Sequence, residues 1–514
     1  MAQSSQVRDY LREHGPERAS VISDYFQSEE VTYDAARKRI QRARRADDIQ
    51  TLSAINLPNN EDVLYTRDQY NTFEFWRDLL DLLEDAESSY AWLLHSLAAR
   101  GGMVLKDRFP IVSGRPEKMQ DQISASRALE NLMSIGFLEV EEIADFGEVV
   151  RFTEPAAPPM NLEFDVARLS ARITTENVIM KGLKQWGIIN GLVSPGRVEI
   201  AEMPRLPELP NFGQFNWDLT APSYTRPLAT AEEDDTPFPG FVVADVLFGK
   251  RLKTEEIRYF DGKCAMLRSQ DSMPRFMGLL IATNFSEEAL EYGRSRGLLL
   301  TTPRNLFGEE VGEAIENLLQ TLQHAGKLAA QGPEKIGRLL TDLSRIEGAA
   351  QNLRGPLFEM LVAHCIREVA GFYVEIGRVV TDPKQQKSAE IDVLAGSRRQ
   401  EVLAVECKGV EPGGTVGKDE VEYWLTRRVP RIRNWFLEQE DWRNATHYFE
   451  IWTSGEFTDE AAEYLEARKR ETEKYQIDFR DGSGVGQYAT RAKSSDHIIA
   501  TLNQHYLEHP LGNV

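Results

Sequence analysis

The sequence predicts a multidomain protein in which two small modules of helices and a β-hairpin precede two α/β domains built on one plan. Two observations lead to this fold class. Residues 5–153 show twice a set of helical segments followed by strand, turn and strand. The remaining chain shows twice the same order of strands and helices, at a spacing of roughly 170 residues. The length of 514 residues allows three or four domains.

Residues 1–70 form the first helical module. The stretches SQVRDYLREH and RASVISDYF have the apolar spacing of amphipathic helices, and YDAARKRIQRARRADDI follows as a third, basic helix. Two short strands around a Pro-Asn-Asn turn come next, in IQTLSAINLPNNEDVLYTR. Three helices followed by a two-stranded wing resemble a winged helix, a fold in which one helix enters the major groove of DNA.

The third helix of this module is densely basic. In a chain with a formal net charge of −21, such a local cluster favours contacts with phosphates and base edges of nucleic acid. The alternative is a solvated basic face that meets the chain's own surplus carboxylates. The candidate nucleic-acid-binding residues of this helix are Arg37, Lys38, Arg39, Arg42, Arg44 and Arg45.

Residues 71–160 contain a linker helix and a second module. The acidic stretch NTFEFWRDLLDLLEDAE is the linker, and the segment 88–153 again gives helices, strand, turn and strand. It resembles a second winged helix. Its helix ISASRALENLM has only Arg127 as a basic residue, so this module is expected to pack against protein. The Pro-rich stretch TEPAAPPMN marks the boundary.

Residues 161–332 and 333–514 share one plan. The clearest match aligns NFSEEALEYGRSR with EFTDEAAEYLEAR, and Ser286 and Thr458 are the expected N-caps of these two helices. Each helix follows an apolar strand and precedes another. Further upstream, GFVVADVLFG matches EVLAVECKG. The pattern predicts a duplicated α/β domain.

Charged side chains stand on two apolar strands of the last domain, in SAEIDVLAGSRRQEVLAVECKG. Because side chains alternate along a strand, Glu406 and Lys408 share one face, and Glu390 and Asp392 share a face of the paired strand. Carboxylates that converge at a strand end suit Mg²⁺ or Mn²⁺. With a nearby lysine to orient water, they favour metal-assisted hydrolysis of a phosphodiester. The alternative is an exposed strand end with a surface ion pair.

These strands resemble the PD-(D/E)xK nuclease superfamily, and most closely its Mrr-like and Holliday-junction-resolvase-like branches, over residues 350–485. Asp392 matches the aspartate of the motif, Glu406-Cys407-Lys408 matches (D/E)xK, and Glu359 resembles the additional helical glutamate of many members. Ile391 stands where the motif has proline. The resemblance implies a restriction-endonuclease-like domain, with a mixed sheet flanked by helices, that hydrolyses DNA or, less often, RNA.

The resemblance also assigns roles to these residues. It makes Glu359, Asp392, Glu406 and Lys408 the candidate catalytic residues, with Lys408 positioning the attacking water. It implies Mg²⁺ (or Mn²⁺) bound by Asp392, Glu406 and the backbone carbonyl of Cys407. Further candidate ligands are Glu359 and Glu390.

By analogy, such architectures serve restriction or anti-phage defence, with DNA as partner and in some cases an ATPase or helicase partner protein or a homodimer. Two other functions stay open: a structure-specific DNA repair or recombination nuclease, and a non-catalytic DNA-binding regulator. The intact Glu406-x-Lys408 argues against the regulator, because a scaffold has no need of the lysine.

The motif is incomplete in the first α/β domain. In VVADVLFG, Asp245 and Leu247 stand at the places of the metal-binding glutamate and the lysine, and Asp218 stands for the aspartate. Lys250 is out of phase with the strand face by one residue, unless a bulge intervenes. Residues 161–332 are therefore expected to form a degenerate nuclease-like domain that serves in binding or dimerisation.

Two segments downstream of the catalytic strand remain. TRRVPRIRNW contains Arg427, Arg428 and Arg431, which are candidates either for the DNA path or for the exposed side of a helix broken at Pro430. PGGTVGKDE departs from a phosphate-binding loop because Asp419 replaces Ser/Thr, so a mobile loop beside the site is expected.

Composition excludes several other classes. The chain has 81 acidic and 60 basic residues, a balance that argues against general attraction to membranes or nucleic acid. Three cysteines without metal-ligand spacing do not build a disulfide framework. The N-terminus lacks the apolar core of a signal peptide, and no apolar run approaches the roughly 18 residues that span a bilayer. The protein is expected to be cytoplasmic and not to bind membranes.

Overall fold

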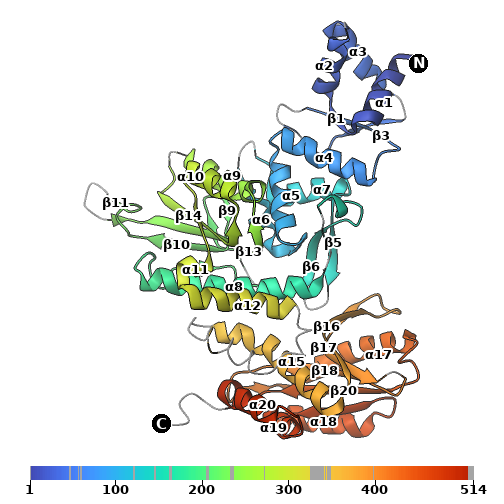
Figure 1. The fold of residues 1–514 in the computed structure, drawn as a ribbon, viewed down its shortest axis with the longest axis vertical. Coiled ribbons are helices and arrows are strands. Elements are labelled where there is room, and N and C mark those ends of the chain that lie inside the picture. Colours follow the sequence, from blue (N-terminus) through green and yellow to red (C-terminus); the bar gives the residue numbers. More distant parts are fainter. Residues whose placement is uncertain are drawn as a thin grey trace. The chain divides into compact units, whose positions relative to one another are not determined.

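The computed structural model divides into two compact units (Figure 1). The first unit comprises Met1–Glu142, Glu148–Asp165 and Gly191–Thr301, and the second comprises Ile143–Gly147, Val166–Asn190 and Thr302–Val514. The structure describes residues 2–29, 31–45, 48–55, 57, 61–119, 122–143, 146–160, 162, 165–203, 208–231, 237–270, 272–323, 341, 343, 349–397 and 399–507. No helix among them is long and apolar enough to cross a membrane.

The N-terminal module of the first unit has three helices and a three-stranded antiparallel sheet in the order β1-β3-β2. On α3, Ala36, Ile40 and Ala43 recur at helical spacing and are buried, which leaves the basic side chains on the other faces. The elements are α1 (Ala2–His14), β1 (Glu17–Arg18), α2 (Ala19–Ser28), α3 (Tyr33–Ala43), β2 (Ile49–Leu52) and β3 (Val63–Thr66). The short β1 was not predicted.

The second module repeats this order of elements, with its sheet in the order β4-β6-β5. Thr72, Ser88 and Ser124 cap α4, α5 and α7 by accepting backbone N–H hydrogen bonds. The elements are α4 (Phe73–Asp85), α5 (Ser89–Ala99), β4 (Met103–Leu105), η2 (Lys106–Arg108), α6 (Phe109–Ser113), α7 (Ala125–Ser134), β5 (Leu138–Ile143), β6 (Gly147–Phe152) and η3 (Pro158–Met160).

The first unit also contains a five-stranded mixed sheet in the order β15-β14-β13-β10-β7. Its core includes Trp217, Leu247, Phe260 and Leu280, and α9 packs against α5 of the second module. The elements are β7 (Glu199–Ile200), β8 (Asn211–Phe212), β9 (Phe215–Asn216), β10 (Leu219–Ser223), β11 (Thr230–Ala231), β12 (Pro237–Phe238), β13 (Gly240–Leu252), α9 (Thr254–Arg268), β14 (Phe276–Phe285), α10 (Glu287–Ser295) and β15 (Leu299–Thr301).

In the second unit, a group of helices precedes the other sheet. Helix α8 packs against α11, α12 and α15, and α15 also packs on β16, β17 and β18. The helices are α8 (Val166–Ile189), α11 (Pro303–Phe307), α12 (Glu309–Gln323) and α15 (Ala349–Ala370).

The second five-stranded sheet has the order β16-β17-β18-β20-β22. The elements are β16 (Tyr373–Thr381), β17 (Ser388–Ser397), β18 (Glu401–Lys408), β19 (Thr415–Val416), α16 (Lys418–Tyr423), the π-helical turn η4 (Trp424–Arg428), α17 (Val429–Glu438), β20 (Thr446–Thr453), β21 (Glu456–Phe457), α18 (Asp459–Glu471), β22 (Gln476–Arg480), α19 (Gly482–Ala489), α20 (Ser495–Leu502) and η5 (Asn503–Leu507).

The two sheets have the same arrangement of strand directions. In chain order, the first three strands of each pair antiparallel, and the third, fourth and fifth pair parallel. Ser286 and Thr458 cap the matched helices α10 and α18, as predicted, by accepting hydrogen bonds from Ala289 and Ala461. The predicted α/β architecture of mixed sheets flanked by helices is confirmed.

Candidate functional site

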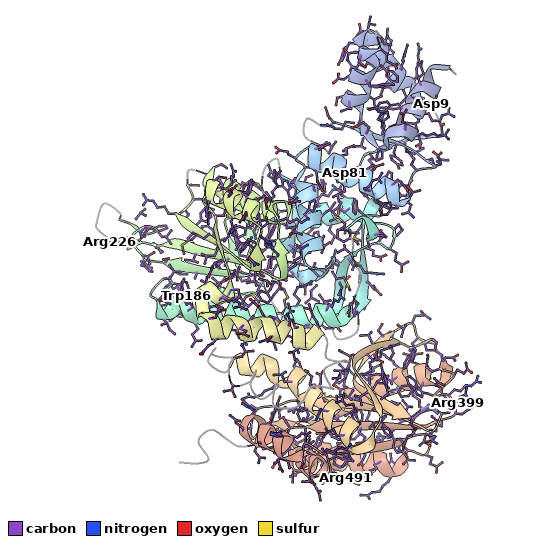
Figure 2. All side chains as sticks on the ribbon, viewed as in Figure 1. Asp9, Asp81, Trp186, Arg226, Arg399 and Arg491 are labelled. Carbon is purple, nitrogen blue, oxygen red and sulfur yellow. The ribbon has the colours of Figure 1, made fainter. Side chains whose placement is uncertain are left out.

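Two predicted acidic residues lie side by side on β17 and β18. The two strands pair antiparallel, from the pair of Ser397 with Glu401 to the pair of Val393 with Val405. Asp392 and Glu406 are the next residues, at the open end of this hairpin. The backbone N–H of Cys407 donates to Asp392 Oδ2 over 2.7 Å. Arg399, labelled in Figure 2, lies in the turn at the other end. The sheet therefore fixes the spacing of the two carboxylates.

Lys408 lies beside Glu406. Its Nζ is 3.0 Å from Glu406 Oε1, and its side chain is half-buried. Burial by itself lowers the pKa of Lys408, but Glu406 and Asp392 outweigh it and raise the pKa above its ordinary value. Lys408 is therefore a cation. Because Glu406 is only 4% exposed, the alternative of a surface ion pair is wrong.

The acidic residues of the cluster repel one another. Burial raises the pKa of Glu359 on α15 well above its ordinary value, and Asp392, Glu390 and Glu406 raise it further. Burial likewise raises the pKa of Asp392, with added contributions from Glu406 and Glu390. The cations Lys408 and Arg428 contact Glu406 in this cluster of carboxylates. Such a centre suits a divalent cation.

Arg428 contacts both strand carboxylates. Its Nη1 lies 2.9 and 2.7 Å from the two oxygens of Glu406 and 3.8 Å from Asp392 Oδ1. Arg428, a candidate either for the DNA path or for the exposed side of a helix, is paired with the carboxylates of the acidic cluster. Of its neighbours, Arg427 is exposed, whereas Arg431 donates to the carbonyl of Ser388 over 3.0 Å.

The arrangement fits the predicted divalent ion. One cationic atom of Arg428 approaches both Asp392 and Glu406, so the two carboxylates face a common position. Carboxylate oxygen is the ligand that Mg²⁺ and Mn²⁺ prefer. No group of three or more His, Cys, Asp or Glu side chains in the described part of the chain is arranged to hold a metal. The predicted set needs two carboxylates and the carbonyl of Cys407.

The first unit contains a matching pair of acids. The N–H of Val246 donates to Asp218 Oδ2 over 2.7 Å, in the same way that Cys407 donates to Asp392. Asp218 and Asp245 therefore correspond to Asp392 and Glu406. Leu247 then stands at the position of Lys408, as predicted from the sequence.

Cations of the chain occupy this first pair. Lys263 Nζ on α9 lies 2.7 Å from Asp245 Oδ2, and Arg108 Nη2 on η2 lies 2.8 Å from Asp218 Oδ1. Burial raises the pKa of Asp245 and lowers that of Lys263. The side chains of Lys263, Asp245 and Asp218 have no exposed surface. Lys250 pairs instead with Glu256 at the strand end. Asp218 and Asp245, together with Arg108 and Lys263, therefore form a buried cluster of ion pairs.

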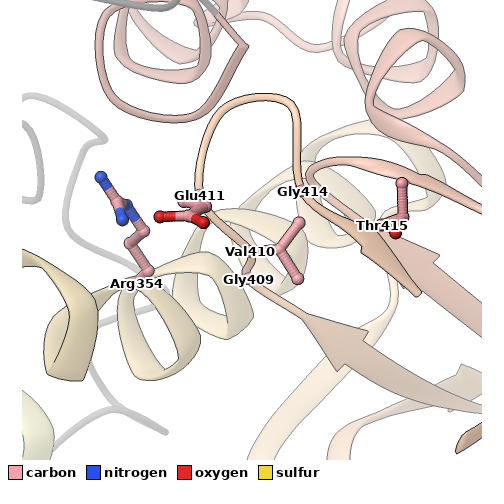
Figure 3. A pocket seen from close by; sticks show the side chains of 6 residues that line it. All are labelled: Arg354, Gly409, Val410, Glu411, Gly414 and Thr415. Atoms are coloured by element: carbon pink, nitrogen blue, oxygen red, sulfur yellow. The ribbon is translucent and has the colours of Figure 1, made fainter. Parts of the chain in front are cut away.

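A hollow of about 370 Å³ opens directly after Lys408 (Figure 3). In Figure 3, Arg354 on α15 and Glu411 face each other across it, with Gly409 at its base. A Cβ at Gly409 would lie 2.4 Å from the carbonyl oxygen of Arg354, so glycine permits this close approach. The hollow is lined by Arg354, Gly409, Val410, Glu411, Gly414 and Thr415.

The loop beyond Lys408 is tied to the segment that follows β20. Ser454 Oγ accepts from the N–H of Val410 over 2.9 Å, and the N–H of Glu456 donates to the carbonyl of Gly414 over 3.1 Å. The segment predicted as a loop, residues 412–420, contains the short strand β19, which pairs with β21, and the start of α16. The structure brings Glu359, Asp392, Glu406 and Lys408 together.

The basic residues of α3 and of the two positions that follow it differ in their surroundings. Arg37, Lys38 and Arg45 are exposed. Arg39 instead donates to Gln6 over 2.9 Å and lies over the ring of Phe26. Arg42 is exposed, and Arg44, also exposed, pairs with Asp62 at 2.6 Å.

Comparisons of the chain with protein-family models, with curated proteins and with solved structures returned no match. Sequence reasoning missed Arg108, Lys263 and Arg354. The sequence did contain a signal for Lys263. It stands on α9 among Phe260, Cys264 and Leu267, which are apolar and buried. A lysine on such a face needs a buried acid as partner.

Proposed function

We propose that this chain is a divalent-metal-dependent nuclease that hydrolyses phosphodiester bonds in DNA. The observation that carries the proposal is the cluster at the open end of β17 and β18, where Asp392 and Glu406 face one cationic position beside Lys408. A role in restriction or anti-phage defence is part of the proposal by analogy with nucleases of similar architecture.

The residues divide the chemistry between them. Asp392, Glu406 and the carbonyl of Cys407 would hold the divalent ion, with Glu359 and Glu390 close to it. The ion supplies a Lewis acid and an activated water when bound. Lys408, whose pKa Glu406 and Asp392 raise, would donate hydrogen bonds that orient the attacking water and offset charge on the phosphate.

The proposal also assigns the other domains. Both sheets would be restriction-endonuclease-like, and the first would be non-catalytic because internal cations occupy its acids. Both N-terminal modules would be winged helices, which the element order and the strand order β1-β3-β2 and β4-β6-β5 support.

The purified chain is expected to cleave plasmid, linear or single-stranded DNA with Mg²⁺ or Mn²⁺ and not with EDTA. Cleavage of RNA substrates, measured in parallel, shows whether the chain acts on DNA, on RNA or on both. If no substrate is cut in any metal, even after cell extract is added, the enzyme proposal is wrong and a DNA-binding regulator becomes the better assignment.

Helix α3 provides a prediction for DNA binding. Changing Arg37, Lys38 and Arg45 together to alanine should weaken binding and lower the slope of log affinity against log salt by up to about three, because each phosphate contact contributes roughly 0.9. Fluorescence anisotropy with duplex DNA at several salt concentrations measures this.

The matched control for this variant removes the same charge elsewhere. The change of Arg468, Lys469 and Arg470 to alanine on α18 should leave the slope within error. If the α3 variant keeps the wild-type slope, α3 does not contact the DNA backbone.

Arg354 provides a second binding prediction. In the described residues its guanidinium has no hydrogen-bond or ion-pair partner, and it lines the hollow next to Lys408. Arg354→Gln should lower the salt slope by about one, as loss of a single phosphate contact does. The test is fluorescence anisotropy with duplex DNA in Ca²⁺ at several salt concentrations. The variant Arg367→Gln, on the same helix, is measured in parallel as the control. Equal slopes in the two variants would exclude Arg354 from the path.

A further inference from the structure

Both α/β sheets receive a cation from the segment that follows their third strand. In the first sheet, Lys263 on α9 reaches back to Asp245 on β13. In the second sheet, Arg428 at the end of η4 reaches back to Glu406 on β18. The matched hydrogen bonds of Val246 and Cys407 make these two acids equivalent. The chain therefore places its own cation on the equivalent acid twice.

The two cations differ in their surroundings. Lys263 and Asp245 have no exposed surface, so water cannot reach the pair. The Arg428 side chain is 13% exposed and stands beside Lys408, which is 28% exposed. Arg428 also ends a π-helical turn, a local distortion that occurs often at functional sites. Its guanidinium thus has a route to solvent that Lys263 lacks.

We propose that Arg428 is the resident counter-ion of the second site, and that a divalent ion binds only when its guanidinium leaves the space between Asp392 and Glu406. This inference rests on the metal site of the proposed function. It makes Arg428 a residue that sets metal affinity through Glu406.

The geometry requires the exchange. A divalent ion coordinates carboxylate oxygens at about 2.0–2.2 Å. Nη1 of Arg428 already lies 2.7 and 2.9 Å from both oxygens of Glu406 and 3.8 Å from Asp392. An ion bound to both carboxylates would lie in contact with the guanidinium, and two cations in contact repel. Metal binding therefore has to break the pair of Arg428 and Glu406.

The pairing also gives the metal-free site a stable form. Glu406 is nearly buried, and a buried carboxylate without a partner is unfavourable. Arg428 supplies that partner when no metal is present. The metal must then compete with a charge-assisted hydrogen bond, which lowers its apparent affinity.

The test is Mn²⁺ binding by isothermal titration calorimetry, with no nucleic acid present. Arg428→Gln is expected to bind Mn²⁺ at least about tenfold more tightly than the wild type, because loss of a charge-assisted bond removes the competitor. Arg431→Gln, a change three residues along that leaves Glu406 paired, should bind as the wild type does. Asp392→Asn should abolish binding.

Each result decides between the inference and the proposed function. Equal or weaker Mn²⁺ binding in Arg428→Gln than in the wild type overturns the inference and leaves the nuclease proposal intact. Absence of Mn²⁺ binding in both proteins overturns the metal site and therefore both proposals. If Arg428→Gln does not fold, Arg428→Lys takes its place. The single ammonium of lysine pairs less well with Glu406 than the guanidinium does. Tighter Mn²⁺ binding in Arg428→Lys therefore supports the inference, and unchanged binding overturns it.

Discussion

Lys408→Ala is expected to lower metal-dependent cleavage of DNA by about a hundred- to a thousandfold, while DNA binding stays within a few-fold of the wild type. The reason is that the side chain lies 3.0 Å from Glu406 and is held protonated at the centre. Loss of one positioned donor to developing charge typically reduces the rate by this factor. Cleavage rates under single-turnover conditions, with anisotropy for binding, measure the two effects separately.

Three further variants sharpen this result. Asp392→Ala should abolish cleavage altogether, because it removes the carboxylate that faces the cationic position. Lys474→Ala, an exposed lysine of the same unit, should leave the rate unchanged. Cleavage that survives in Lys408→Ala but disappears in a folded Asp245→Ala protein would show that the first sheet, and not the second, carries the activity.

Lys263→Ala is expected to lower the free energy of unfolding of the first unit by about 3–5 kcal/mol. The change leaves the carboxylate of Asp245 fully buried without its cation, which is among the most destabilising single changes in a core. The contact of Lys263 Nζ with the ring of Trp217, at 3.8 Å from the ring centroid, is lost as well. Urea denaturation followed by tryptophan fluorescence measures the loss.

A double change distinguishes the buried charge from poor packing. Lys263→Met combined with Asp245→Leu removes both charges and should recover most of the lost stability, since apolar replacements of buried pairs are often neutral. Lys250→Ala is the matched control, because its pair with Glu256 is partly exposed and should contribute at most about 1 kcal/mol. A double variant as unstable as the single one would mean that packing, not charge, is decisive.

Local patterns accounted for the elements that carry the site. The alternation in VLAVECKG placed Glu406 and Lys408 on one face of a strand, and the structure has both in contact on β18. The caps Ser286 and Thr458 followed from short-range hydrogen-bond rules and are present. Such features depend on neighbours a few residues apart, which is why the sequence suffices for them.

Long-range partners were not predictable in the same way. Arg428 lies 22 residues beyond Glu406, and Arg108 lies 110 residues before Asp218. Nothing local distinguishes them from surface arginines, because their partners are set by how the sheets fold and pack. For the same reason Arg39 was grouped with its exposed neighbours, although it bonds to Gln6.

The position of β18 within its sheet has a consequence for the substrate. The strand pairs with β17 as far as Val405 and with β20 along its whole length, so that Lys408 itself pairs with Thr453. Pairing with β20 therefore holds the backbone beneath the centre in place, and the side chains adjust more readily than the backbone does. On the proposed function, the distortion that brings a phosphodiester to Lys408 falls on the nucleic acid. What is cut then depends on how readily a given stretch of DNA can be deformed.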